Sequence, residues 1–239
     1  MSYQFEGGCY FLGDTHSVPK TRGLLGHIPP DSLVQHAGDF GLGFQPYQKD
    51  LADLGFLNDF LISKDIMLWA ISGNHDRPDF WRGDLNKELN NKFSHIELIP
   101  DYTRREVNGQ SFLFVGGAIS VDRSFRIEGR DYWAAEEVVR VDLAELEPCD
   151  VLVCHTAPSF IGPPSRGPFP MSFKDRDPTL IEELESEREY MDRLFARVRP
   201  RYAFFGHFHV AETYYHEGCK MRILDINELV EHVPRSRGM

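Results

Sequence analysis

Five short apolar runs, each leading directly into a polar segment, constrain the fold of this chain more than any other feature of its sequence. They cover residues 9–12, 32–37, 66–72, 150–154 and 202–205. Glycine, aspartate or asparagine bounds these runs, and their length is typical of strands rather than of buried helices. We therefore expect five buried strands.

Longer amphipathic stretches separate these runs. Leucines at helical spacing predict a helix over 47–63, and the clearest helix runs over 178–198, with Asp177 as its N-cap. An Asn-Gly pair within 96–120 and a Glu-Gly pair within 211–226 each lie between two extended runs, which is typical of hairpins. Helix-linked strands thus alternate with antiparallel pairs, so we expect an α/β (α+β) chain in which helices cover layers of sheet.

The length of 239 residues indicates a single domain over 1–239. Residues 161–178 contain five prolines and two glycines before the long helix. Long loops in compact domains are usually functional, so we expect an active-site loop at 161–177. The alternative is a surface connection without a role.

The charge balance of the chain bears on its partners. It has 26 lysines and arginines against 37 aspartates and glutamates, a formal net charge of −11. This balance disfavours extended nucleic-acid binding, which needs a basic face, but it allows a small phosphorylated substrate beside a bound metal. The N-terminus lacks a signal-peptide pattern, and no run approaches the roughly 18 apolar residues of a membrane span. We expect a cytoplasmic protein with no membrane partner.

Side chains that bind metals follow all five apolar runs. They are Asp14 and His16, Asp39, Asn74 with His75 and Asp76, His155, and His207 with His209. Ligand sites of α/β sheets form at the carboxyl ends of strands, so these distant segments are expected to converge. In extended backbone, side chains two residues apart point to the same side. The two residues of each D-x-H or H-x-H pair could therefore coordinate one ion. Carboxylate, imidazole and amide groups without thiolate suit manganese, iron, zinc or nickel.

The order D-x-H, G-D, G-N-H-D, H and G-H-x-H, from Asp14 to His209, resembles the calcineurin-like metallophosphoesterase superfamily. The stretches GGAISVDRSFR (116–126) and HTAPSF (155–160) look like a bacterial and phage-type group of small members. The resemblance implies a four-layer αββα sandwich, in which two mixed β-sheets are flanked by helices. GDFGLG and GNHD replace the forms typical of phosphoprotein phosphatases, which argues against a phosphoprotein as the substrate.

The resemblance also implies two divalent metal ions, and we expect manganese, with iron, zinc or nickel as alternatives. By the family's pattern, the ligands of one ion would be Asp14, His16, Asp39 and His209. The ligands of the other would be Asp39, Asn74, His155 and His207. His75 would be an active-site histidine close to the substrate rather than a ligand.

In the reaction that we expect, a hydroxide bridging the two ions attacks phosphorus in line with the leaving oxygen. His75 would donate a proton to that oxygen or stabilise its charge. Asp76 either orients His75 or is a turn or helix-cap carboxylate. Guanidinium groups match phosphate oxygens in pairs, so three arginines are candidate substrate ligands, with surface solvation as the alternative. They are Arg77, Arg123 and Arg126.

The leading hypothesis is therefore a metallophosphoesterase, a dinuclear enzyme that hydrolyses a phosphate mono- or diester. One alternative is a nuclease or phosphodiesterase acting on nucleic acid, which the acidic balance and the lack of a basic stripe disfavour. Another is a non-catalytic metal-binding scaffold of the same fold, which would be expected to lack some ligands, whereas this chain has the full set. The sequence indicates neither the native substrate nor an oligomeric state.

Overall fold

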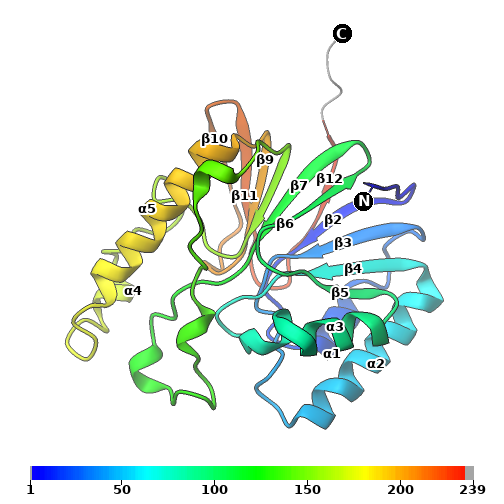
Figure 1. Ribbon diagram of the computed structural model, residues 1–239, viewed down its shortest axis with the longest axis horizontal. Coiled ribbons are helices and arrows are strands. Elements are labelled where there is room, and N and C mark those ends of the chain that lie inside the picture. Colours follow the sequence, from blue (N-terminus) through cyan, green and yellow to red (C-terminus); the bar gives the residue numbers. More distant parts are fainter. Residues whose placement is uncertain (1, 235–239) are drawn as a thin grey trace.

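Two β-sheets face each other across an apolar layer, and helices cover their outer faces (Figure 1). The computed structural model describes residues 2–234. This arrangement confirms the expected four-layer αββα sandwich. Within the described residues, no helix combines the length and the apolar character needed to cross a membrane.

The first sheet has five strands in the order β12-β2-β3-β4-β5. The strands are β2 (Gly8–Leu12), β3 (Ser32–His36), β4 (Ile66–Ala70), β5 (Ile96–Leu98) and β12 (Leu229–His232). β2 to β5 run parallel to one another, and β12 pairs antiparallel with β2. The helices on its outer side are α1 (Val18–Leu24), α2 (Tyr47–Lys64) and α3 (Gly83–Lys92) (Figure 1).

The second sheet has seven strands in the order β1-β6-β7-β8-β9-β11-β10. The strands are β1 (Ser2–Tyr3), β6 (Thr103–Val107), β7 (Gln110–Val115), β8 (Val151–Cys154), β9 (Tyr202–Phe205), β10 (Glu212–His216) and β11 (Cys219–Ile223). Its β6–β7 and β10–β11 pairs are antiparallel and its other pairs parallel, so this sheet is mixed. The helices beside it are α4 (Pro168–Met171) and α5 (Leu180–Val198) (Figure 1). Short 3₁₀ turns lie in the connections, at Pro78–Trp81, Arg123–Phe125, Ala134–Glu136 and Leu143–Glu145.

Aromatic side chains fill the layer between the sheets. Phe11 and Trp69 point inward from the first sheet, and Phe114 and Phe204 point inward from the second. The rings of Phe11 and Phe204 stack on each other. Burying one such side chain stabilises the fold by roughly 1.5–3 kcal/mol, so this layer fixes how the two sheets face each other.

The structure confirms most of the local predictions and corrects one helix start. All five apolar runs form strands, and the 47–63 pattern forms α2. Both hairpins form, and positive φ angles at their Asn-Gly and Glu-Gly turns give the backbone twist that two-residue turns require. The long helix begins at Leu180 instead of residue 178, with Thr179 as its N-cap. Asp177 therefore does not occupy the N-cap position, and its carboxylate accepts two hydrogen bonds from the Arg123 guanidinium.

Candidate metal centre

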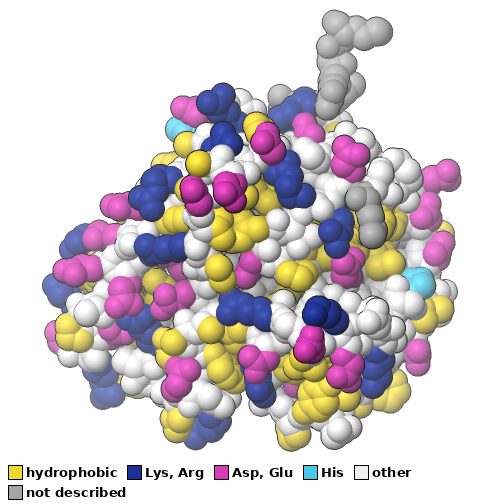
Figure 2. All heavy atoms as spheres, viewed as in Figure 1, with side chains coloured by type: hydrophobic (Ala, Val, Ile, Leu, Met, Phe, Trp, Pro, Cys, Tyr) yellow, Lys and Arg dark blue, Asp and Glu magenta, His cyan; other side chains and the backbone are white. Residues whose placement is uncertain are grey.

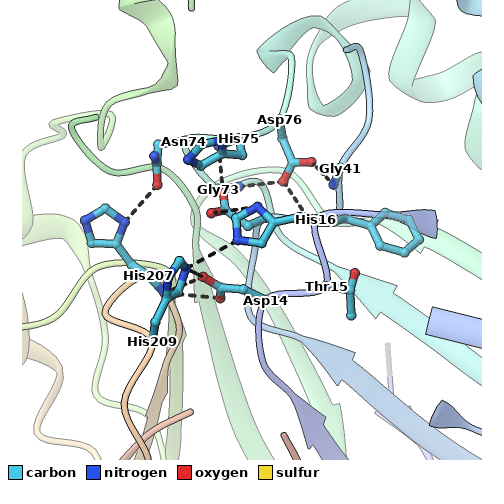
Figure 3. Close-up of polar contacts among 12 residues, drawn as sticks. Asp14, Thr15, His16, Gly41, Gly73, Asn74, His75, Asp76, His207 and His209 are labelled. Carbon is cyan, nitrogen blue, oxygen red and sulfur yellow. Dashed lines mark hydrogen bonds and ion pairs between the residues drawn. The ribbon is translucent and has the colours of Figure 1, made fainter. Parts of the chain in front are cut away.

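The candidate ligands, which follow five different strands, come together in the structure, and most of them are labelled in Figure 3. The strands that lead into them are β2, β3 and β4 of the first sheet, and β8 and β9 of the second. These ends meet because the stacked sheets bring their carboxyl edges to one side of the molecule. The convergence expected from the sequence is therefore present.

One cluster consists of Asp14, His16, Asp39 and His209, whose ligand atoms all lie within 4.8 Å of one another. His209 Nε2 is 3.0 Å from Asp14 Oδ2 and 3.3 Å from His16 Nε2. The backbone N–H of His207 donates to both oxygens of the Asp14 carboxylate, at 3.1 and 3.0 Å. These bonds fix the direction in which Asp14 faces the histidines.

A second cluster forms on the other side of Asp39. Asn74 Oδ1 lies 3.0 Å from His155 Nε2 and 2.8 Å from His207 Nδ1, and His155 Nε2 lies 3.2 Å from Asp39 Oδ1. His155 Nδ1 is 2.8 Å from the carbonyl oxygen of Ala37, a bond that leaves Nε2 to face the cluster.

The spacing and chemistry of both clusters fit divalent metal ions. Two ligands about 2.1 Å from one ion, at right angles to each other, would lie about 3 Å apart, which is the separation seen between several of these donors. Oxygen and imidazole nitrogen are the donors in both clusters. Such donors suit manganese, iron, zinc or nickel.

The ionisable groups of the site influence one another strongly. Burial alone would raise the pKa of Asp39, but the neighbouring histidines, His155 foremost, hold it well below its ordinary value. Burial would lower the pKa of His155, but the Asp39 carboxylate raises it to about 10. For His75, burial is the main cause of a pKa lowered to about 4, and the positive charge of Arg126 adds to it against the opposing effect of Asp39.

Four of the candidate ligands have left-handed backbone conformations. The φ angles are +50° at His16, +54° at Asp39, +68° at His207 and +52° at His209. Few residues with a Cβ adopt this region, and the surrounding structure has to hold them there. The extended geometry that we expected for the D-x-H and H-x-H pairs is therefore wrong, because the chain turns at these ligands.

Two motif glycines are required by close approach of the carboxylates. A Cβ on Gly73 would lie 2.1 Å from Asp39 Oδ1, and one on Gly206 would lie 2.3 Å from Asp14 Oδ1. Backbone atoms are close as well: the Gly73 Cβ would lie 2.3 Å from Asp39 N, and the Gly206 Cβ would lie 2.8 Å from the carbonyl oxygen of Ala37. This explains why glycine begins both the G-N-H-D and the G-H-x-H segments.

Asp76 connects two loops of the site. Its fully buried carboxylate accepts hydrogen bonds from the backbone N–H groups of Phe40, Gly41, Leu42 and Gly73, at 2.7–3.1 Å (Figure 3). It thereby joins the segment after Asp39 to the segment that contains Asn74. These contacts favour the turn-carboxylate interpretation, one of the two alternatives that the sequence left open for Asp76.

His75 contacts both the Asp39 carboxylate and an arginine. Its backbone N–H donates to Asp39 Oδ1 at 2.7 Å, and its Nε2 accepts from Arg126 Nη2 at 2.9 Å. Arg126 is also paired with Asp122. Both His75 and Arg126 line a pocket of about 400 Å³ that opens from the second cluster.

The other two candidate arginines lie elsewhere. Arg123 is held by three carboxylates, those of Asp177, Glu183 and Glu137, so it connects α5 to the loop after β7. Arg77 pairs with the exposed Asp79. The structure therefore brings only Arg126, of the three, to the wall of the pocket.

Sequence reasoning missed three residues that support the site. Ser120 accepts a hydrogen bond from Asn74 Nδ2 at 3.0 Å and so turns the amide oxygen toward the histidines. Glu187 and Arg188 of α5 are each 3% exposed and line the pocket. In the sequence they lie within a run of charged residues, a pattern typical of a solvent-exposed helix face.

We predict that Asp76→Asn lowers the free energy of unfolding of the metal-free protein by about 2–4 kcal/mol. Each oxygen of the Asp76 carboxylate accepts hydrogen bonds from two backbone N–H groups. In the Asn variant an NH₂ group replaces one oxygen, so two of these N–H groups would face a donor and lose their acceptor. Urea unfolding measures the change. The exposed Asp79→Asn serves as control and should change stability by less than about 1 kcal/mol; equal losses would contradict this role of Asp76.

Comparison with known proteins agrees with this arrangement. The family model described as calcineurin-like phosphoesterase matches residues 9–211. No curated protein matches the chain significantly.

Three solved structures match at low sequence identity. One has a TM-score of 0.52 at 13% identity and covers 91% of this chain and 90% of its own, which indicates a shared fold. TT1561 of Thermus thermophilus has a TM-score of 0.49 at 12% identity, covering 91% and 89%. Phosphopantetheinyl hydrolase (PptH) from Mycobacterium tuberculosis has a TM-score of 0.46 at 13% identity, covering 98% and 99%. With the family model matching most of its length, the chain belongs to the calcineurin-like phosphoesterase family.

Proposed function

We propose that this protein hydrolyses phosphate esters with two divalent metal ions, which its two clusters hold on either side of Asp39. The position of Asp39 carries the proposal. Its Oδ1 lies 3.2 Å from His155 Nε2 in one cluster, and its Oδ2 lies 3.7 Å from His16 Nδ1 in the other. A buried carboxylate that faces two sets of donors is suited to bridge two cations.

The proposed ligands of one ion are Asp14, His16, Asp39 and His209. Those of the other are Asp39, Asn74, His155 and His207. We propose manganese as the metal, with iron, zinc and nickel as alternatives that suit the same donors. When bound, such ions supply an activated water molecule and neutralise charge on the phosphate.

His75 and Arg126 are the groups proposed to act on the ester itself. Before substrate binds, the imidazole is neutral and its Nε2 accepts a hydrogen bond from the guanidinium. A phosphate between them would take over the Arg126 donor, and its negative charge would raise the pKa of His75. His75 would then carry a proton that it can donate to the leaving oxygen.

The charge distribution and the pocket favour a small substrate over a nucleic-acid strand. Acidic and basic side chains are interspersed over the face shown in Figure 2, without a continuous basic stripe. Arg126 and Arg188 are the cationic residues among those that line the pocket. We also propose that loop 161–177 covers the site, since Pro163, Pro164 and Phe169 belong to its wall.

The direct test of the proposal is hydrolysis by metal-free and metal-loaded protein. Chelator-treated protein should not hydrolyse p-nitrophenyl phosphate or its bis-p-nitrophenyl diester, and manganese should restore turnover of at least one of them. Which ester is preferred assigns the protein as a mono- or diesterase. Full activity of protein shown by elemental analysis to be metal-free would contradict the proposal.

We further predict that Asp39→Asn weakens both metal sites, because one bridging oxygen becomes a neutral amide nitrogen. Elemental analysis after gel filtration should find fewer than two metals per chain. Turnover should fall at least about 100-fold, since even residues that only orient metal ligands contribute 10–100-fold. Asp59→Asn, on the exposed side of α2, is the matched control and should change neither quantity. An Asp39→Asn variant with two metals and normal turnover would show that Asp39 is not the bridge.

His75→Ala should separate chemistry from metal binding. The backbone N–H that donates to Asp39 remains, so both metals should be retained. For esters with leaving groups of high pKa, kcat should fall roughly 10²–10⁴-fold, and for p-nitrophenyl phosphate it should fall less.

The control for this variant is His27→Ala, an exposed histidine. A lost metal would reassign His75 as a ligand. A loss of kcat that is equal for all leaving groups would contradict proton donation and indicate a role in holding the phosphate.

A further inference from the structure

The pocket beside the second cluster has two chemically different ends. Its polar end contains Asn74, His75 and His207. Its other end is apolar and is formed by Val121, Pro163, Pro164, Phe169, Leu184 and Phe208. These side chains come from the loop after β7, from loop 161–177, from α5 and from the segment after β9, so four distant parts of the chain build this apolar wall.

Two charged residues beside the apolar wall, Glu187 and Arg188, make hydrogen bonds to the backbone of the segments that form it. The Arg188 guanidinium donates to the carbonyl oxygens of Ala157, Pro158, Ile161 and Pro163. Glu187 accepts from two backbone N–H groups, at 3.2 and 3.4 Å. Neither side chain is therefore free to pair with a charged group of a ligand.

The volume and exposure of this end limit what it can hold. At about 400 Å³ the whole pocket is at the small end of the range for small-molecule sites. Phe169 lies on its wall and is 66% exposed, which leaves apolar surface that a ligand would cover. None of the residues lining it is a lysine, and Arg126 already belongs to the polar end, so a second phosphate has no free cation there.

From this we propose that the apolar wall, formed by the six residues named above, binds the organic group of the ester, and that the substrate is a phosphate ester of an uncharged, apolar alcohol or phenol. This proposal rests on the hydrolysis proposed above. The apolar wall belongs to the same pocket as Asn74 and His207, so the ligand that it binds is taken to be the organic group of the hydrolysed ester. A phosphate at the polar end places its ester oxygen, and the carbon attached to it, toward the apolar wall. An organic group that carries a charge would find no free charged partner at Glu187 or Arg188.

The test uses the n-alkyl monophosphates from methyl to hexyl with manganese-loaded protein. Their leaving alcohols have nearly the same pKa, so the chemistry stays constant while the buried apolar area grows. kcat/KM should rise about two- to fourfold with each added methylene group until the pocket is full. A terminal carboxylate on the hexyl chain should remove most of this gain.

Binding without turnover gives an independent measurement. The n-alkylphosphonates have no ester bond to hydrolyse, and their Kd by calorimetry should decrease with chain length in parallel with the rise in kcat/KM. Phe169→Ser should flatten both dependences, and Phe169→Leu should keep them. Phe56→Ser is the matched control, because Phe56 is also 66% exposed but lies on α2, outside the pocket.

The two proposals fail in different ways. If metal-loaded protein hydrolyses methyl and p-nitrophenyl phosphate but shows no dependence on chain length, the apolar specificity is wrong and the hydrolysis stands. Equal effects of the Phe169→Ser and Phe56→Ser variants would also overturn the apolar specificity. If no ester is hydrolysed and no phosphonate binds, the proposed hydrolysis fails as well.

Discussion

The buried carboxylate of Asp39 is the constraint on which the rest of the site depends. It is 1% exposed, lies in a left-handed turn, and faces histidines from both sheets. Gly73 has to lack a Cβ because Asp39 Oδ1 occupies the position that this Cβ would take. The Asp76 carboxylate accepts hydrogen bonds from the backbone N–H groups of Phe40 and Gly73, next to Asp39. Burying an unpaired carboxylate in such a position would cost several kcal/mol of solvation free energy. The surrounding histidines and the proposed cations offset this cost.

Charge in this protein is organised locally. The chain as a whole is acidic, with a formal net charge of −11, whereas the proposed function requires its site to bind cations and then an anionic ester. Around the proposed reaction centre, Arg126 is turned toward His75. Elsewhere on the wall of the same pocket, Arg188 is used entirely within the structure, where it fixes the loop that forms the apolar wall. The same residue type is thus proposed to contact the substrate in one case and stabilises the fold in the other.

Patterns that repeat along the chain could be predicted from the sequence, whereas features set by distant contacts could not. The strands and the convergence of Asp14 with His209 follow from apolar runs and from polar residues at their ends. The helix α5 begins two residues later than the local pattern predicts, and the ion pair between Asp177 and the distant Arg123 could not be predicted from that pattern. The left-handed turns at the ligands and the burial of Arg188 likewise arise from tertiary packing, which overrides local propensity.

The central claim, that one carboxylate joins two metal ions, is tested most directly by electron paramagnetic resonance of the manganese-loaded protein. Two Mn²⁺ ions bridged by Asp39 are expected to be spin-coupled, so a coupled spectrum should build up to two equivalents of metal. In the Asp39→Asn variant it should give way to the hyperfine pattern of isolated ions. An isolated-ion spectrum from the unmodified protein at two equivalents, or saturation at one, would contradict the shared site.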